Sequence, residues 1–311
     1  MRAIVTDPHS TPRLAVRDAP MPVPALSQAL VKVEAISLNV GETRTALAAG
    51  TCYIPGWDFA GVIEQPAADG SSPPRGARVF GFAVPLGAWA EYVTVRAGHM
   101  TTTPEGVTSV QAASLPVAGL TALVCLERAG PVLGRRVLVT GAAGGVGRFA
   151  CKFAALSGGK VFAISRRPSL PDQLRADGVD VAGVFTTMAE AKSAGQYDVI
   201  LDSVGGETLA LALTAVAVDG VVVNCGNSEE QLTSFNAREF FHKANARFEG
   251  VWGARELAND CSPLLARVAD LVVRGKLNTP IDAVLPWTQI AEAAERLVSG
   301  GVDGKVVLTV D

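Results

Sequence analysis

Apolar and polar positions follow one pattern in the first part of the chain and another beyond about Pro116. The first part holds short β-prone runs that end in glycine, proline or polar turn residues. Such runs predict strands. They are Ala3–Thr6, Gln28–Ala35, Ala60–Glu64, Ala77–Phe80 and Trp89–Val95. Several short strands joined by Gly/Pro turns indicate a β-rich, barrel-like module.

Beyond Pro116, short apolar strands alternate with helical stretches. The strand Val137–Thr140 is followed by a helix over Val146–Ser157 and a strand over Val161–Ser165. The alternation continues with a helix near Pro171–Asp177, a strand at Asp198–Asp202, a helix at Thr208–Val216 and a strand at Gly220–Cys225. This order predicts the α/β class, with a doubly wound parallel sheet.

The pattern changes again after about Trp252. The expected elements there are a helix over Pro263–Arg274, a strand over Ala283–Pro286, a helix over Thr288–Ser299 and a strand over Lys305–Val310. A chain of 311 residues corresponds to about two domains. The two changes of pattern therefore give candidate domain boundaries.

Composition narrows the classes of function. The 27 Lys and Arg against 30 Asp and Glu give a net charge of −3, which argues against nucleic-acid binding. The most apolar stretches, Leu115–Leu126 and Leu209–Val218, are shorter than the roughly 18 residues of a membrane span. The N-terminus lacks the apolar core of a signal peptide, so we expect a cytoplasmic protein.

Cysteine and histidine give no sign of a disulfide framework or a metal site. The five cysteines are widely spaced and odd in number, and the three histidines are scattered. A zinc site needs about four nitrogen, sulfur or oxygen ligands, usually in clustered spacing. We therefore expect no bound metal.

A glycine-rich segment joins the strand Val137–Thr140 to the following helix. It reads Gly141-Ala142-Ala143-Gly144-Gly145-Val146-Gly147. Glycines there allow a tight turn and a close approach of the backbone to a pyrophosphate, which the helix N-terminus can bind. A purely structural turn needs glycine as well. The strand before, the helix after and the second strand favour dinucleotide binding, through Gly144, Gly145 and Val146 among others.

The end of the second strand indicates which dinucleotide. An NAD site usually has Asp or Glu there, bound to the ribose 2′-hydroxyl. This chain has Ser165, Arg166 and Arg167 instead. Guanidinium groups bind a phosphate through paired hydrogen bonds, so these residues favour the 2′-phosphate of NADPH, with Arg166 the nearer to the strand. The alternative is that both arginines are solvated loop residues.

A later strand ends in Asn224-Cys225-Gly226. Ligands of open α/β sheets bind beyond the carboxyl ends of the strands, so Asn224 and Gly226 are candidates for cofactor contacts. The glycine could equally serve only to end the strand.

These segments together resemble the medium-chain dehydrogenase/reductase superfamily, and within it the zinc-independent quinone oxidoreductase (zeta-crystallin-like) branch. Besides the glycine loop, the segments that carry the resemblance are Leu38–Glu42, Ile54–Val62, Gly87–Val93, Gly119–Ala122, Asp202–Gly206 and Gly304–Leu308. The resemblance implies a GroES-like catalytic domain of residues 1–116 and 253–311. It places a Rossmann dinucleotide-binding domain of residues 117–252 inside it.

Differences from the zinc-bearing relatives narrow the range of reactions that the resemblance implies. Those relatives have a Cys near Asn39 and a His-Glu pair where this chain has Trp57-Asp58, and their cysteine-rich lobe is absent. The resemblance then implies hydride transfer from NADPH to a quinone or an α,β-unsaturated carbonyl. Two alternatives stay open: an enoyl reductase for an enoyl thioester or polyketide-type intermediate, and a non-catalytic NADPH-binding protein.

The resemblance also implies site residues in the loop between Asn39 and Gly56. Asn39 is expected either to donate its amide to the substrate carbonyl or to hold the nicotinamide ribose. Tyr53 is expected to donate a hydrogen bond or a proton. The alternative for Tyr53 is packing against Pro55 and Trp57.

Further cofactor residues are expected elsewhere in the chain. Thr121 is expected at the start of a helix. It would either form a hydrogen bond to the cofactor's ribose or phosphate or cap the helix. Val251 and Lys305 are expected near the cofactor. The apolar edge strand near Phe248–Trp252 is expected to pair between subunits of a homodimer.

Overall fold

The chain folds into two units. The computed structural model describes residues 1–256 and 258–311. Unit 1 comprises Met1–Leu120 and Leu257–Asp311, and unit 2 comprises Thr121–Glu256. The first boundary lies a few residues beyond the expected position, inside the continuous helix α3 (Pro116–Ala129).

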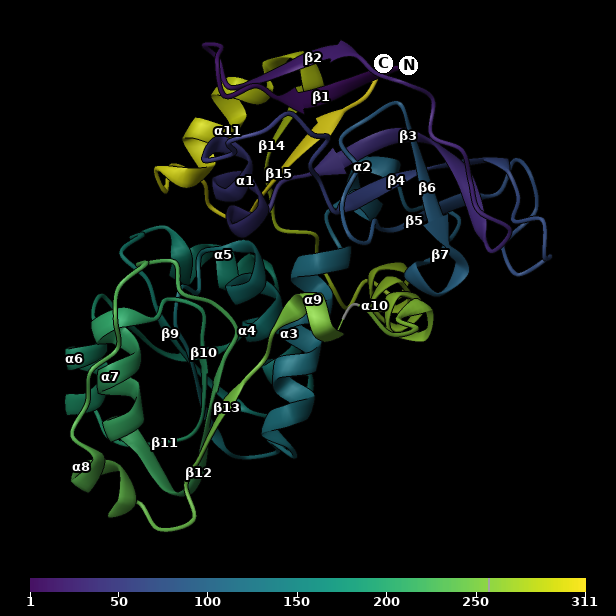
Figure 1. Cartoon of the computed structure of the whole chain (residues 1–311). Helices are drawn as coiled ribbons and strands as arrows, with labels where there is room; N and C mark the ends of the chain where they lie inside the picture. The colour runs from purple at the N-terminus through teal and green to yellow at the C-terminus, as the bar shows by residue number, and fades with distance from the viewer. Residues whose placement is uncertain (257) are drawn as a thin grey trace. The chain divides into compact units, whose positions relative to one another are not determined.

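Unit 1 is built on a mostly antiparallel sheet. Its strand order is β14-β15-β3-β4-β5-β7, with β6 also paired to β3 (Figure 1). These strands are β3 (Gln28–Ser37), β4 (Asp58–Gln65), β5 (Arg78–Phe82), β6 (Tyr92–Arg96), β7 (Met100–Thr102), β14 (Ile281–Pro286) and β15 (Lys305–Thr309). A separate pair is formed by β1 (Arg2–Thr6) and β2 (Leu14–Asp18). Trp89, Trp287 and Phe59 are fully buried in the core of this unit.

Besides the start of α3 and two short 3-10 helices, unit 1 contains four α-helices within the described residues. They are α1 (Val40–Leu47), α2 (Ser109–Ala113), α10 (Ser262–Val273) and α11 (Ile290–Val298). Helix α1 was not expected from the apolar pattern. Its buried residues are Glu42, Thr43 and Ala46, so its inner face is mainly polar and has no apolar periodicity.

Unit 2 has a parallel sheet in the order β10-β9-β8-β11-β12-β13 (Figure 1). The strands are β8 (Arg136–Val139), β9 (Lys160–Ile164), β10 (Val181–Phe185), β11 (Tyr197–Asp202), β12 (Val216–Asn224) and β13 (Arg247–Gly250). The helices between and after them are α4 (Gly145–Leu156), α5 (Leu170–Ala176), α6 (Met188–Ser193), α7 (Gly206–Ala215), α8 (Ala237–Phe241) and α9 (Gly253–Glu256). The predicted α/β class and doubly wound sheet are confirmed.

The central strands of unit 2 are apolar because both faces of the sheet are covered. Leu138, Ile200 and Val222 lie in one buried cluster with Leu209 and Leu213 of α7. The edge strand β10 and the short helix α6 were missed by the sequence reading. All five β10 residues are half-buried or exposed, so the strand lacks the continuous apolar run of its neighbours.

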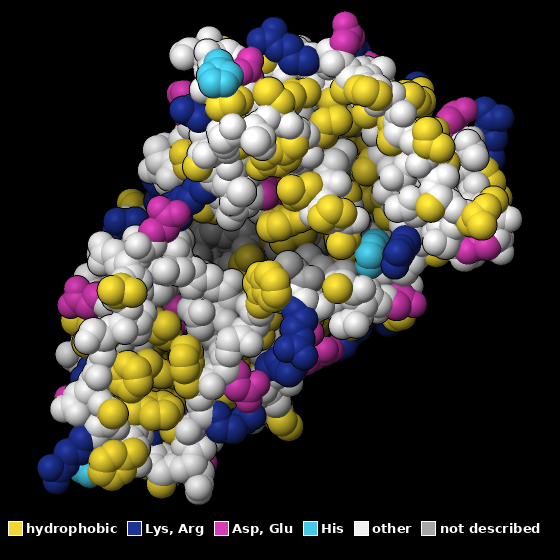
Figure 2. All heavy atoms as spheres, in the orientation of Figure 1, with side chains coloured by type: hydrophobic (Ala, Val, Ile, Leu, Met, Phe, Trp, Pro, Cys, Tyr) yellow, Lys and Arg dark blue, Asp and Glu magenta, His cyan; other side chains and the backbone are white. Residues whose placement is uncertain are grey.

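The face of the molecule shown in Figure 2 carries no large patch of side chains of one charge. Basic and acidic side chains are interspersed there among apolar and uncharged ones. Among the described residues, no helix has the length and apolar character needed to cross a membrane.

Candidate functional site

The glycine loop of unit 2 joins β8 directly to α4. Gly141 has a positive φ of 57°, a conformation that favours glycine. Gly147 lies so close to the loop that an added Cβ would be 2.3 Å from the Gly141 carbonyl oxygen. Since α4 begins at Gly145, the N–H groups of Gly145, Val146 and Gly147 have no acceptor within the helix. The loop therefore offers free backbone donors at a helix N-terminus, as an anionic pyrophosphate requires.

Asp202, at the end of β11, connects this loop to the neighbouring strands through hydrogen bonds. Its fully buried carboxylate accepts hydrogen bonds from Thr140 Oγ1 at 2.7 Å, from Asn224 Nδ2 at 2.7 Å and from the Gly205 N–H at 3.1 Å. Burial raises the pKa of Asp202, while the bonds from Thr140 and Asn224 oppose the rise. The strand ends of β8, β11 and β12 are thereby held together.

Three predicted cofactor residues lie at the end of β12 or beside it. Asn224 Nδ2 donates to Asp202 and also to the Gly226 carbonyl oxygen at 2.7 Å, so both amide hydrogens are used inside the protein. A Cβ on Gly226 would lie 2.9 Å from the Ser203 carbonyl oxygen. Val251 is buried and its N–H donates to the Asn224 carbonyl oxygen at 2.8 Å. The structure thus brings Asn224, Gly226 and Val251 together.

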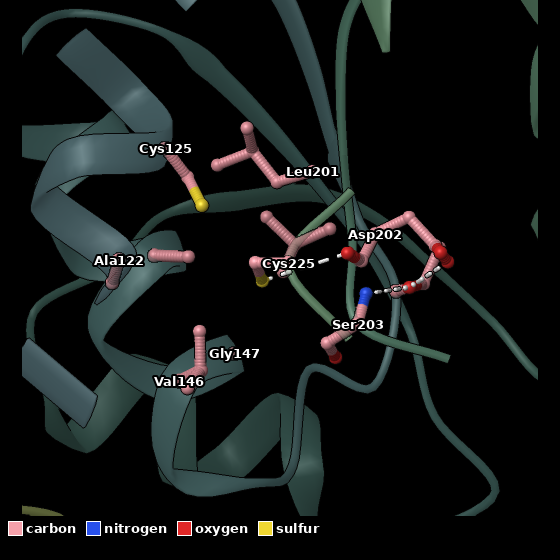
Figure 3. A pocket seen from close by; sticks show the side chains of 11 residues that line it. Ala122, Cys125, Val146, Gly147, Leu201, Asp202, Ser203 and Cys225 are labelled. Atoms are coloured by element: carbon pink, nitrogen blue, oxygen red, sulfur yellow. Dashed lines mark hydrogen bonds between the residues drawn. The ribbon is translucent and has the colours of Figure 1, made fainter. Parts of the chain in front are cut away.

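A small cavity opens beside the glycine loop (Figure 3). Its walls come from α3, from the first two turns of α4 and from the ends of β8, β11 and β12. The lining residues are Ala122, Cys125, Val139, Thr140, Val146, Gly147, Ala150, Leu201, Asp202, Ser203 and Cys225. Among the predicted cofactor residues, Val146 lines this cavity.

Two thiols lie in the wall of the cavity. The Cys125 thiol donates a hydrogen bond to the Cys225 sulfur, which together with burial raises the pKa of Cys125. The Cys225 thiol in turn donates to the Asp202 carbonyl oxygen at 3.5 Å. Sequence reasoning did not single out either thiol, because each stands in or beside an apolar run that reads as core.

Thr121 lies next to this wall but not where it was expected. It is half-buried within α3, which begins at Pro116. The prediction of a helix start at Thr121 was wrong, because proline is favoured in the first turn and begins the helix earlier. A capping role for Thr121 is therefore excluded.

The end of β9 carries the predicted 2′-phosphate residues. Ser165 Oγ accepts a hydrogen bond from the Arg167 N–H at 3.0 Å, which shapes the turn after the strand. Arg166 is exposed, and within the described part of the chain its guanidinium has no hydrogen bond or ion pair. Arg167 is half-buried. The segment from Ser165 to Pro168 contains no carboxylate.

Unit 1 holds a second group of predicted residues around a buried ion pair. Lys305 and Asp58 have side-chain exposures of 2% and 0%, and Lys305 Nζ lies 3.2 Å from Asp58 Oδ2. The Lys305 ammonium also donates to the Leu38 carbonyl oxygen at 2.9 Å and to Asn39 Oδ1 at 2.6 Å. Its three hydrogens thus all have acceptors within the protein.

Asn39 and Glu42 complete this network. Asn39 Nδ2 donates to Glu42 Oε1 and to Asp58 Oδ2, both at 2.9 Å. Glu42 Oε1 also accepts the Asn39 backbone N–H at 3.0 Å, and Oε2 accepts the Trp57 N–H at 2.7 Å. Burial and the Asp58 carboxylate raise the pKa of Glu42 to about 8, against the opposing effects of Asn39 and Lys305.

The Tyr53 hydroxyl, unlike the Asn39 amide, has no hydrogen-bond partner among the described residues. The backbone of this residue pairs with Thr6, whose Oγ1 accepts the Tyr53 N–H at 2.9 Å. Within the described residues its hydroxyl has no hydrogen-bond partner, and the side chain is half-buried. Burial and the Glu42 carboxylate raise the pKa of Tyr53, so the phenol stays protonated and able to donate.

No group of three or more His, Cys, Asp or Glu side chains in residues 1–256 and 258–311 is arranged to hold a metal ion. Asp58, which follows Trp57 where zinc-bearing relatives have a His-Glu pair, is instead paired with Lys305.

Comparison with known proteins agrees with this architecture. Residues 151–308 match the family described as zinc-binding dehydrogenase, and residues 26–105 match the alcohol dehydrogenase GroES-like domain. A solved structure of quinone oxidoreductase from Coxiella burnetii is 27% identical, with a TM-score of 0.86 over 100% of this chain and 99% of that chain.

Two relatives extend the comparison. The mitochondrial NAD(P)H oxidoreductase RTN4IP1 of Bos taurus is 28% identical over 82% of this chain and 70% of its own length. A mycocerosic acid synthase-like polyketide synthase of Mycobacterium tuberculosis is 30% identical over 82% of this chain, which spans only 12% of that longer protein. The chain belongs to the medium-chain dehydrogenase/reductase family, among its quinone oxidoreductase-like members.

Proposed function

We propose that this protein is an NADPH-dependent reductase that transfers hydride to a quinone or an α,β-unsaturated carbonyl without a protein-bound zinc. The observation that carries the proposal is in unit 2. There the glycine loop, with its free helix N–H groups, follows strand β8. The neighbouring strand β9 of the same sheet is followed by Arg166 and by no carboxylate. Family membership and the name NAD(P)H oxidoreductase of one relative support the same cofactor.

We assign each proposed cofactor residue to a part of NADPH by the hydrogen-bond donors or the charge that it provides. The free N–H groups of Gly145 and Val146 would bind the pyrophosphate. Gly144, whose own N–H donates to the Gly141 carbonyl oxygen at 3.0 Å, would shape the turn beside it. Arg166 would pair with the 2′-phosphate. The other residues proposed to surround the cofactor are Thr121, Ser165, Arg167, Asn224, Gly226 and Val251. Since the Asn224 amide hydrogens are engaged, we assign it a supporting role at the strand end.

The bound nicotinamide would supply the hydride, and the protein must stabilise the oxygen on which negative charge develops. Tyr53 is the candidate for this task. Its hydroxyl is protonated, has no partner among the described residues and can donate to a carbonyl oxygen. We keep Asn39 as the second residue of the reacting site, where Glu42 and Asp58 accept its amide hydrogens and hold it in place.

An enoyl reductase is the second candidate. The 30% identity to a polyketide synthase supports it, although the chain spans a small part of that protein. The test is a panel of acceptors, comprising a quinone, a simple enone and an enoyl thioester, in which NADPH consumption is followed. Reduction of the quinone or enone supports the first proposal, and a strong preference for the thioester supports the second. If NADPH binds but no acceptor is reduced, the protein is a non-catalytic NADPH-binding protein.

We also propose a homodimer formed at the edge of the unit 2 sheet. Strand β13 is an edge strand, and Phe248 and Trp252 are 49% and 72% exposed. Unpaired edge strands with apolar side chains favour pairing with a second copy. Light scattering should give twice the chain mass, and a monomeric mass would contradict the proposal.

A further inference from the structure

Two thiols from distant parts of unit 2 meet in the wall of the cavity beside the glycine loop. Cys125 lies on α3, and Cys225 directly follows β12. Figure 3 shows both sulfur atoms turned toward the cavity. The Cys125 thiol donates a hydrogen bond to the Cys225 sulfur, and the Cys225 thiol donates to the Asp202 carbonyl oxygen at 3.5 Å. The two sulfur atoms are therefore direct neighbours.

The two thiols differ in their access to small molecules. Cys125 is 1% exposed, whereas Cys225 is half-buried. The hydrogen bond to Cys225 and burial raise the pKa of Cys125, so this residue stays a thiol. An oxidant dissolved in water therefore meets Cys225 first. Cys125 lies where a second thiol is needed to convert an oxidised Cys225 into a disulfide.

We infer that peroxide converts Cys125 and Cys225 into a reversible disulfide, and that this disulfide weakens NADPH binding. In the first step the Cys225 sulfur attacks one peroxide oxygen, the O–O bond breaks, and a sulfenic acid and one water form. In the second step the Cys125 sulfur attacks the sulfenic sulfur. The S–S bond forms, the S–O bond breaks, and the hydroxide leaves with the thiol proton as a second water. Two thiols are thus oxidised while one hydrogen peroxide is reduced.

The effect on NADPH rests on the proposed function, because Asn224 and Gly226 on either side of Cys225 are proposed to surround the cofactor. A disulfide holds its sulfur atoms about 2.05 Å apart, closer than a hydrogen bond between thiols. Its formation would draw α3 and the end of β12 together and remove the Cys225 thiol bond to Asp202. The backbone there is tightly packed, since a Cβ on Gly226 would lie 2.9 Å from the Ser203 carbonyl oxygen. The displacement would therefore extend to Asn224 and Gly226.

The disulfide is tested on the purified protein with hydrogen peroxide. Catalase then removes the peroxide, iodoacetamide blocks the remaining thiols, and the protein is digested without reductant. We expect mass spectrometry to show two peptides joined through Cys125 and Cys225, and to show them separated after dithiothreitol treatment. Oxidation of Cys225 to a sulfinic acid, with no cross-linked peptide, would overturn the inference.

The effect on the cofactor is tested by calorimetric titration with NADPH before and after peroxide treatment. The Kd should rise about 5-fold or more, as expected for two coupled sites, and dithiothreitol should restore it. Cys225→Ser should abolish this rise, and Cys125→Ala provides the same test if Cys225→Ser does not fold. Cys52→Ser is the matched control, because this exposed thiol of unit 1 has no part in the pair. An equal rise in Cys225→Ser would assign the effect to another group and overturn the inference.

Two outcomes separate this inference from the proposed function. A cross-linked peptide with an unchanged Kd would overturn the effect of the disulfide on NADPH and leave the proposed function intact. A reduced protein that binds no NADPH would overturn the proposed function and, with it, the effect on the cofactor. The cross-linked peptide would still decide whether Cys125 and Cys225 form a disulfide.

Discussion

Asn224 donates a hydrogen bond of 2.7 Å to the buried carboxylate of Asp202, across the ends of two neighbouring parallel strands. The same carboxylate accepts a bond from Thr140, the residue that precedes the glycine loop. One buried acid therefore connects the strand ends of β8, β11 and β12. The shape of the proposed cofactor site depends on this connection.

Removal of the Asn224 amide should weaken both the fold and the site. Asn224→Ala leaves a buried carboxylate with one donor fewer, which should lower the free energy of unfolding by about 1–3 kcal/mol. Urea denaturation measures the change. Asn227→Ala is the control, since the Asn227 side chain is exposed and its amide donates a long hydrogen bond of 3.4 Å to the Gln231 carbonyl oxygen. Equal stability of the two variants would contradict the role given to Asn224.

Arg166 should decide between the two nicotinamide cofactors. Because a charge-assisted hydrogen bond contributes about 1.5–3 kcal/mol, Arg166→Ala should weaken NADPH binding roughly 10- to 100-fold and leave NADH binding unchanged. Calorimetric titration with both cofactors measures this. Arg175→Ala is the matched control on the next helix, where Arg175 pairs with Asp172 in solvent. An equal loss for NADPH and NADH would remove Arg166 from the 2′-phosphate site.

The buried Glu42 should make stability depend on pH. Its pKa is about 8 in the native protein, against an ordinary value of 4.5. Between these values the native state binds one proton more than the unfolded state, so the free energy of unfolding falls as pH rises, by at most about 1.4 kcal/mol per pH unit. Above about pH 8 this contribution becomes constant.

Glu42→Gln should flatten the fall in stability, because it removes the titrating group. Urea denaturation at several pH values compares this variant with the wild type. The exposed residue Glu105 provides the control variant Glu105→Gln, which should keep the wild-type slope. Parallel curves for Glu42→Gln and the wild type would show that Glu42 does not titrate in this range.

Bound NADPH should protect Cys225 from alkylation. Cys225 is half-buried in the wall of the cavity beside the glycine loop, so an occupied site should shield it. Iodoacetamide labelling followed by peptide mass spectrometry measures the rate with and without NADPH. The exposed Cys52 of unit 1 serves as an internal control whose rate should not change. Equal rates at Cys225 in both conditions would place the cofactor elsewhere.

The sequence predicted the parts of the fold that have regular apolar patterns. The strands and helices from Val137 to Asn224 follow such patterns, and the glycine loop was recognised because its neighbours agree with it. Helix α1 was missed because its buried face holds Glu42 and Thr43. Strand β10 was missed because, as an edge strand, it is only partly covered.

At the candidate site, the contacts between distant residues could not be predicted from the sequence, for a similar reason. Residue types near Asn39 and Tyr53 suggested chemistry, but no pattern shows which groups are already engaged. The Asn39 amide oxygen accepts a hydrogen bond from Lys305, which is 266 positions away in the sequence. The pair Cys125 and Cys225 also joins distant segments, and only the folded chain brings the thiols together.

The most direct test of the proposed function is the steady-state rate of NADPH oxidation by the purified, chelator-treated protein with a quinone and with an enone. We predict turnover of at least one of them with NADPH, a much lower kcat/KM with NADH, and no loss of activity after chelation. NADPH binding without turnover of either acceptor would contradict it.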